Sequence, residues 1–339
     1  MLARHWILLS LALPSRLPGQ DLFEFRRVAP DVFMAIPRPE RWTNSNAGVI
    51  ILDDGVLIVD SHGSPRAAQA LIRQLRQITK KPVRYVVNTH FHPDHIYGNQ
   101  AYTAAWPAGV EIISSELTRQ HLERLGAQWL REELDSLPGT IAHLRDSLAR
   151  ANDPTLRDTL AQQLRDTESR LRDVRALHLT LPTVTFDRSL IIRRGQRAVQ
   201  LLYLRRGHTE GDVVVYLPRE RVVVTGDLVT GWAPYMGDSY PYDWIQTLRN
   251  LETLDFEFVI GGHGDLLTGK GPCQLWADYL TDLMEETERA SAGEVTLDQV
   301  KARVIPILKD RFASRFSPKL MSRIEGNVAK AFEVVHASH

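Results

Sequence analysis

Short apolar runs that end at Gly, Asp, Asn or Pro recur in both halves of the chain, and amphipathic stretches of helical period separate them. In the first half these runs lie at residues 32–36, 48–52, 56–60 and 83–87. The Asp54-Gly55 pair between two of them is a strong hairpin signal. In the second half the runs lie at residues 183–186, 190–192, 199–203, 213–217, 222–225 and 256–260. Each half therefore has strands followed by a helix, an order that predicts two sheets packed between helices.

A long amphipathic segment interrupts the part of the chain that is rich in strands. Residues 116–177 carry apolar positions at helical spacing, and Asn152-Asp153-Pro154 has the pattern of a helix N-cap followed by proline. We therefore predict a helical hairpin inserted at residues 116–178. Its alternating charges favour a solvated face. We interpret the hairpin as a packed peripheral insertion, with a lid or an oligomer contact as alternatives. Within residues 272–339 we expect three further helices, at residues 273–290, 296–311 with Thr296 as cap, and 318–336. We predict one domain over residues 21–339.

Composition limits the partners of the chain. The 339 residues include 41 Lys and Arg and 41 Asp and Glu, so the net charge is zero and no global field attracts nucleic acid or an anionic membrane. We therefore expect a small-molecule substrate, no nucleic acid and no membrane. The single cysteine, Cys273, excludes an intrachain disulfide and a structural zinc site built from several cysteines.

The amino terminus resembles a short secretory signal. Arg4 and His5 precede an apolar stretch at residues 6–13, which is near the lower length limit for such a signal, and no clear cleavage site follows it. We interpret residues 1–20 as a possible signal peptide. This predicts a periplasmic or secreted protein, with a cytoplasmic location as the alternative.

The residues most typical of metal chemistry follow the run at residues 83–87. His90, His92, Asp94 and His95 lie within six positions of one another. Two histidines at i and i+2 on an extended segment point to the same side, so both rings can reach one cation. Asp94 and His95 lie past Pro93, where the chain must turn, and can reach a second cation. Imidazole and carboxylate ligands suit zinc, iron or manganese.

Three more segments have a strand that leads to glycine and then to a ligand-type side chain. These segments are Gly207-His208-Thr209, Gly226-Asp227 and Gly262-His263-Gly264. Glycine permits the tight backbone that a ligand at the rim of a sheet requires. Each segment alone is a weak signal, because Gly-His and Gly-Asp pairs are common in simple turns.

Together with the His-x-His-x-Asp-His segment, this ordered set resembles the metallo-β-lactamase superfamily of metallohydrolases over about residues 28–266. The resemblance implies an α/β fold, a four-layer αββα sandwich with metals at one rim of the sheets. It implies that His90, His92 and His208 hold a first metal and that Asp94, His95 and His263 hold a second. Asp227 would bridge the two metals or bind the second. Two zinc ions are the expected cofactors, with iron or manganese as alternatives.

The resemblance also suggests the chemistry. We expect a hydrolase that cleaves a lactam, lactone or thioester by means of a metal-bound hydroxide, which Asp94 orients and deprotonates. His92 stands where an oxygen-reducing branch has glutamate, and Asp227 stands where one lactamase subclass has cysteine. The pattern is therefore more similar to glyoxalase II and the lactonases. A mononuclear iron sulfur dioxygenase, which uses the same first triad, and a non-catalytic metal-binding module are the alternatives.

An aromatic segment follows Asp227 closely. Residues 232–244 include the rings that we interpret as candidate substrate contacts, Trp232, Tyr235 and Tyr240. The same rings could instead anchor a long loop onto the sandwich. Oligomerisation through the helical insertion is a further hypothesis.

Overall fold

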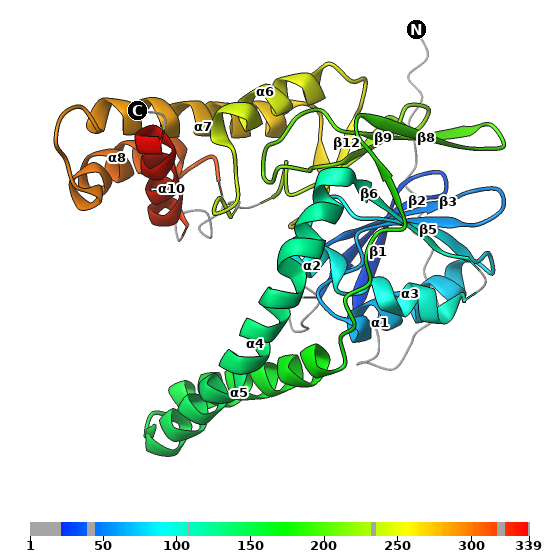
Figure 1. Cartoon of the computed structure of the whole chain (residues 1–339), viewed down its shortest axis with the longest axis horizontal. Helices are drawn as coiled ribbons and strands as arrows, with labels where there is room; N and C mark the ends of the chain where they lie inside the picture. Colours follow the sequence, from blue (N-terminus) through cyan, green and yellow to red (C-terminus); the bar gives the residue numbers. More distant parts are fainter. Residues whose placement is uncertain (1–21, 39–44, 108, 232–234, 317–322, 338–339) are drawn as a thin grey trace, which may run out of the picture.

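The computed structural model describes residues 22–38, 45–107, 109–231, 235–316 and 323–337, which form two mixed sheets with helices on their outer faces (Figure 1). The possible signal peptide at residues 1–20 lies outside the described residues. Among the described residues, no helix is long and apolar enough to cross a membrane.

One sheet comes from the first half of the chain and has its strands in sequence order. Its antiparallel part ends at β4, after which β5, β6 and β7 pair in parallel. The predicted Asp54-Gly55 hairpin is confirmed, because Ile51 pairs with Val56 across the turn. The strands of this sheet are β1 (Phe23–Ala29), β2 (Val32–Pro37), β3 (Ala47–Ile51), β4 (Val56–Val59), β5 (Val83–Val87), β6 (Glu111–Ser115) and β7 (Val184–Phe186).

The other sheet comes from the second half and has the order β13-β12-β11-β10-β9-β8. Its pairs are antiparallel except for β11 with β12, which are parallel and end together at Gly226 and Gly261. Parallel strands end at the same edge of a sheet, so residues that follow β11 and β12 become neighbours. The strands are β8 (Ser189–Arg194), β9 (Arg197–Leu202), β10 (Val214–Leu217), β11 (Val222–Gly226), β12 (Phe258–Gly261) and β13 (Leu267–Thr268).

Alternating side chains of both sheets build the layers. Leu57 of β4 faces the core between the sheets, to which Val224 of β11 contributes from the other side. The next residue, Ile58, points to the opposite face of its sheet, onto α1 (Pro65–Ile78) and α3 (Asn99–Ala105). On the far face of the other sheet, α6 (Pro241–Glu252) and α7 (Gly271–Ala290) cover Val223. The predicted αββα sandwich is therefore confirmed.

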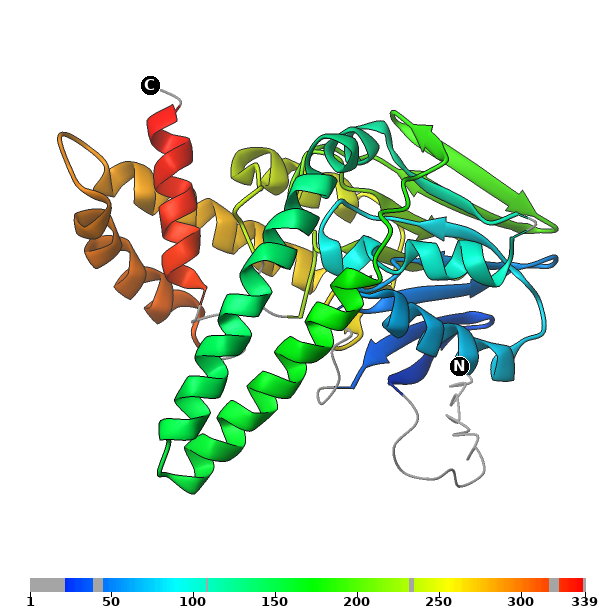
Figure 2. The same ribbon diagram turned by 60° about the horizontal axis from the view of Figure 1, so that its bottom comes forward.

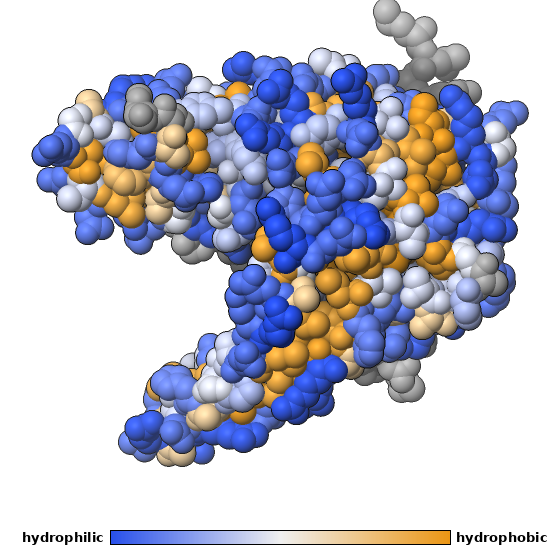
Figure 3. All heavy atoms as spheres, in the orientation of Figure 1, coloured by the Kyte–Doolittle hydropathy of each residue, from blue (hydrophilic) through white to orange (hydrophobic). Residues whose placement is uncertain are grey.

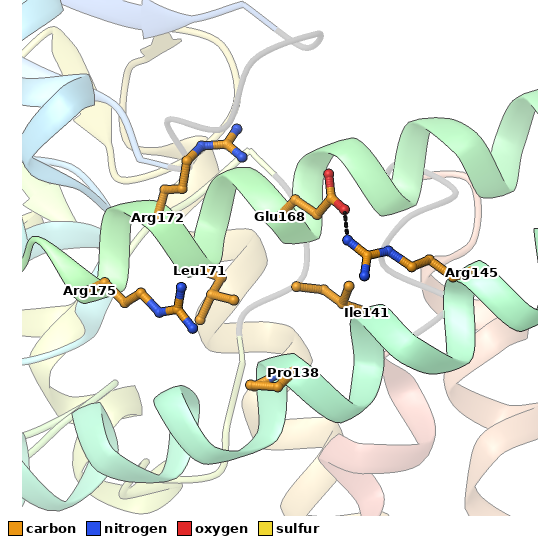
Figure 4. A pocket seen from close by; sticks show the side chains of 7 residues that line it. All are labelled: Pro138, Ile141, Arg145, Glu168, Leu171, Arg172 and Arg175. Carbon is orange, nitrogen blue, oxygen red and sulfur yellow. Dashed lines mark hydrogen bonds and ion pairs between the residues drawn. The ribbon is translucent and has the colours of Figure 1, made fainter.

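The predicted helical hairpin consists of α4 (Glu116–Arg150) and α5 (Pro154–Arg175), which project away from the sandwich (Figure 2). Asp153 caps α5 by accepting a hydrogen bond from the amide of Leu156, as its pattern predicts. Between the two helices lies an open pocket of about 340 Å³ beside Pro138, floored by Ile141 and Leu171 (Figure 4). On the face shown in Figure 3, apolar side chains gather where the hairpin meets the body, between hydrophilic flanks.

The last helices, α8 (Leu297–Phe312) and α10 (Ile324–Ala337), pack together with α7 around Tyr279 and Phe312. Thr296 begins α8 with a reciprocal capping box to Gln299, which agrees with its predicted role as a cap. The sequence predicts that the final helix begins at residue 318, but residues 317–322 lie outside the described part of the chain.

Arg170 anchors the hairpin to the sandwich. Its side chain is 7% exposed, forms a two-pronged ion pair with Glu133 of α4, and donates to the carbonyl of Gly63 at 2.6 Å. We expect Arg170→Leu to lower the free energy of unfolding by about 2 kcal/mol, because it removes hydrogen bonds of a charged group and leaves the buried Gly63 carbonyl and the half-buried Glu133 carboxylate without this partner.

Arg172→Leu is the matched control, because Arg172 is exposed on the same helix. It should change the free energy of unfolding by less than about 0.5 kcal/mol. Urea denaturation of both variants measures the difference, and equal effects would contradict an anchoring role for Arg170.

Candidate metal centre

The predicted ligand residues lie together at one edge of the sandwich, where strands of both sheets end. His90 follows β5, and Pro93 begins the short helix α2 (Pro93–Ile96), which carries Asp94 and His95. Asp227 follows β11, His263 follows β12, and His208 lies in the segment between β9 and β10. Segments that are far apart in the sequence are thus brought together because the two sheets pack face to face.

His90, His92 and His208 form a first cluster. The Nε2 atom of His90 lies 3.1 Å from Nδ1 of His92, and Nε2 of His208 lies 3.0 Å from the same atom. His90 and His208 are buried, and His92 is half-buried. The i and i+2 histidines therefore present ring nitrogens to one point, as their spacing predicts.

Asp94, His95 and His263 form a second cluster. Nε2 of His263 lies 3.2 Å from Oδ2 of Asp94, and Nε2 of His95 lies 3.5 Å from the same oxygen. Asp227 lies between the two clusters, because its carboxylate is 3.4 Å from His263 Nε2, 3.5 Å from His95 Nε2 and 3.6 Å from His208 Nε2. This is the place that a bridging ligand requires.

The electrostatics of the second cluster favour a positive charge. Burial disfavours a charged His95 ring, but Asp94, Asp60 and Asp227 outweigh this effect and raise the pKa of His95 to about 9. Burial also opposes ionisation of Asp227, yet the neighbouring His263 and His95 hold its pKa well below the usual range. The first cluster differs, since burial above all lowers the pKa of His208 to about 3 and keeps its ring neutral, as a metal ligand must be.

Buried atoms without a hydrogen bond provide a test of whether these residues fit metal ions. Within the described residues, Nε2 of His95 and Oδ1 of Asp227 are buried and make no hydrogen bond, although they lie 3.5 Å from one another. Buried polar atoms are almost always hydrogen-bonded, so two facing atoms without such a bond fit a group that binds between them. A cation bound by both atoms would satisfy them, and neutral imidazole and carboxylate are suitable ligands for zinc, iron or manganese.

Asp60 contacts His95 directly and His90 through Thr89, and the sequence analysis did not identify it. Its buried carboxylate accepts hydrogen bonds from the amide of Thr89 at 2.8 Å, from the Thr89 hydroxyl at 2.9 Å, and from Nδ1 of His95 at 2.8 Å. Nδ1 of His90 lies 3.0 Å from that hydroxyl. If both Nδ1 atoms donate, the Nε2 lone pairs of His90 and His95 face the clusters. The sequence offers only an aspartate at the end of an apolar run as a signal, and the structure adds that its φ is 65°.

Glycines let the ligand loops approach one another. A Cβ on Gly262 would lie 2.0 Å from Oδ1 of Asp227, and a Cβ on Gly226 would lie 2.4 Å from the Thr89 hydroxyl. Gly226 also has a φ of 53°, which side-chain-bearing residues rarely adopt. The Gly-Asp and Gly-Gly-His patterns therefore have a steric reason.

The aromatic candidates have different surroundings. Tyr235 is 50% exposed and its ring lies 5.7 Å from that of His92, so it borders the first cluster. Tyr240 precedes α6, and the guanidinium of Arg206 covers its ring at 4.3 Å. Trp232 lies outside the described residues.

Among the histidines without a motif, His62 is fully buried, and the carbonyl of Ser45 lies 3.0 Å from its Nδ1. His121 of α4 pairs with Glu210 at 2.8 Å. Both histidines therefore have partners other than the residues of the two clusters.

Comparisons with known proteins agree with this geometry. The model of the metallo-beta-lactamase superfamily matches residues 41–263. A linear primary-alkylsulfatase of Pseudomonas sp. (strain ATCC 19151) is 24% identical over 267 residues, which cover 74% of this chain and 48% of that protein. A type 2 metallo-beta-lactamase of Bacillus sp. (strain 170) is 25% identical over 226 residues, or 65% of this chain and 66% of that protein.

The chain thus spans about half the length of the alkylsulfatase. Among solved structures, a metallo-beta-lactamase from Pontibacter korlensis is similar with a TM-score of 0.55 and 17% identity. The similarity covers 76% of this chain and 99% of that one, and it supports the fold alone.

The hydrogen bonds of Asp60 generate a prediction about metal affinity. We expect Asp60→Asn to weaken metal binding by about 10- to 100-fold, because the amide is uncharged and orients His95 and Thr89 less well. Equilibrium competition with a chromophoric chelator measures this affinity, and circular dichroism checks that the fold is retained. Asp265→Asn is the control, since the Asp265 side chain is 83% exposed. Unchanged affinity in Asp60→Asn would refute the role.

Proposed function

The chain belongs to the metallo-beta-lactamase superfamily, and from this premise we propose that it is a metal-dependent hydrolase with two metal ions, zinc in the first instance. The observation that carries the proposal is the pair of donor clusters that share Asp227. His90, His92 and His208 would hold one ion, Asp94, His95 and His263 would hold the other, and Asp227 would contact both.

Metal ions bound there supply Lewis-acid polarisation of the scissile group and lower the pKa of bound water to about 7. The chain's own contribution is orientation and proton transfer. Asp94 is the carboxylate of the centre that is most open to solvent, with its side chain 24% exposed, whereas the Asp227 side chain is 10% exposed. In this proposal Asp94 orients the attacking water and accepts its proton on the carboxylate.

The scissile bond is the finer part of the proposal. We favour a carbonyl-type bond, that of a lactam, lactone or thioester, and the similarity to type 2 metallo-beta-lactamases supports this class. A sulfate ester is the second candidate. It is supported by the similarity to a linear primary-alkylsulfatase, which extends over a larger share of this chain than the similarity to the Bacillus enzyme.

Two other functions make different predictions. A mononuclear iron sulfur dioxygenase would need only the first cluster, whereas this chain also brings Asp94, His95 and His263 together. A non-catalytic metal-binding module would bind metal without turnover.

We also propose that the substrate is a small molecule, with no nucleic acid partner, and that any self-association would use the α4–α5 hairpin.

The decisive experiment combines metal analysis with a substrate panel. Purified protein should contain two zinc ions per chain and hydrolyse nitrocefin, an acyl lactone, a glutathione thioester or a long-chain alkyl sulfate. If only the alkyl sulfate is hydrolysed, the scissile bond is that of a sulfate ester and not a carbonyl-type bond. One iron without zinc would favour the dioxygenase, and full metal occupancy without any hydrolysis would favour the binding module.

A variant of Asp94 tests the proposed proton transfer. We expect Asp94→Asn to lower kcat by about 10²- to 10⁴-fold, because an amide cannot accept the proton of the attacking water. Turnover should be expressed per bound metal ion, since Asp94 is also a proposed ligand. Asp265→Asn should retain normal turnover. Near-normal turnover in Asp94→Asn would exclude this role.

A further inference from the structure

His92 is oriented differently from the other donor histidines of the described structure. It presents Nδ1 to the first cluster, whereas His90 and His208 present Nε2. Its own Nε2 therefore points away from the cluster. There it meets the carboxylate of Asp238, whose Oδ2 lies 3.0 Å away.

We propose that Asp238 is a positioning residue for the first metal: its carboxylate accepts the Nε2–H of His92 and so directs the Nδ1 lone pair of that ring at the metal. The inference rests on the metal centre of the proposed function, but not on any substrate. A neutral imidazole carries one N–H, so a fixed acceptor at Nε2 selects the tautomer that can coordinate through Nδ1. A carboxylate in this place also makes the ring a stronger ligand.

Asp238 lies at the edge of the centre. Its side chain is 43% exposed, so this carboxylate supports the ligand from the solvent side. Asp60, in contrast, is buried and supports His95 and, through Thr89, His90 from the interior.

The segment that carries Asp238 is held in place by backbone contacts. The amide and the hydroxyl of Ser239 both donate to the carbonyl of Met236, at 3.0 and 2.8 Å. The amide of Tyr240 donates to the carbonyl of Gly207 at 2.8 Å. Because Gly207 precedes His208, this bond fixes Asp238 relative to another ligand of the same cluster. A preorganised acceptor of this kind is what a supporting residue requires.

Aromatic rings confine the imidazole of His92 as well. The Tyr235 ring, on the same segment as Asp238, lies 5.7 Å from it, and the Phe91 ring lies 5.0 Å from it. Rotation of the His92 ring about its Cβ bond would break the hydrogen bond to Asp238 and displace these neighbours. The hydrogen bond and the packing thus favour one orientation.

The test measures metal affinity rather than turnover. Metal-free Asp238→Ala and Asp238→Asn are titrated with Co²⁺ against a chromophoric chelator, in an otherwise unchanged chain and in a His263→Ala background that weakens the second cluster. We expect about 10- to 100-fold weaker binding at the first cluster in Asp238→Ala, with an altered Co²⁺ absorption spectrum. Asp238→Asn should recover part of the affinity, because its amide oxygen still accepts the Nε2–H.

Asp282→Ala is the matched control. Asp282 of α7 is a partly exposed carboxylate, paired at 3.0 Å with Arg311, which is not a proposed ligand. It should keep the affinity and spectrum of the unaltered protein. Equal affinities in all variants, or an equal loss in Asp282→Ala, would overturn the inference while the metal centre stands. If the unaltered chain binds no metal at all, the proposed function fails together with this inference. Thermal unfolding of the metal-free variants shows whether Asp238→Ala has a folding defect. If it has one, the metal affinity of Asp238→Asn, compared with that of the unaltered protein, decides whether the inference holds.

Discussion

The hydrogen bonds of the buried Asp60 carboxylate are the interactions that connect the segments of the metal centre. It lies at the end of β4 and accepts hydrogen bonds from the Thr89 amide and hydroxyl, just beyond β5, and from His95 on α2. A buried charge is tolerated only when it is paired and hydrogen-bonded, and here the partners are the segments that carry the ligands. The requirement to satisfy one carboxylate thus orders donors of both clusters. Gly226 permits this arrangement, because a side chain there would collide with Thr89.

Another set of bonds ties the two sheets together at the same edge. The Asn46 amide donates to the carbonyl of Gly262, and its side chain donates to the carbonyls of Gly261 and Gly264, on both sides of His263. The Ser45 hydroxyl donates to the carbonyl of Asp94 at 2.6 Å. Residues 45 and 46 therefore connect α2, which carries Asp94, with the loop that carries His263. Donors on a loop or a single helical turn usually lack the rigidity of donors on strands, and these contacts compensate for that difference.

Local patterns were sufficient for much of the fold. The Asp54-Gly55 turn, the Asp153 and Thr296 caps and the strand periodicity depend on neighbours in sequence, and the structure agrees with each of them. The donor clusters were predictable because four ligand-type residues within six positions, followed in order by the three glycine segments, form a pattern that is rarely met by chance, although each glycine segment alone is weak. Asp60 and Asp238 were missed for the same physical reason. They contact residues 35 and 146 positions away, and nothing next to them in the sequence indicates those partners.

The helical hairpin is more closely connected to the metal centre than a peripheral insertion would be. Phe91, between two ligands of the first cluster, stacks on His121 of α4 at 4.7 Å. The hydroxyls of Ser115 and Thr118, at the start of α4, both donate to the carbonyl of Gly211, in the loop that carries His208. The first turns of α4 thus contact both chain segments that supply the first cluster. A displacement of the hairpin root would therefore act on His90, His92 and His208 together, whereas His95 and the loop of His263 have their own contacts with Asp60 and Asn46.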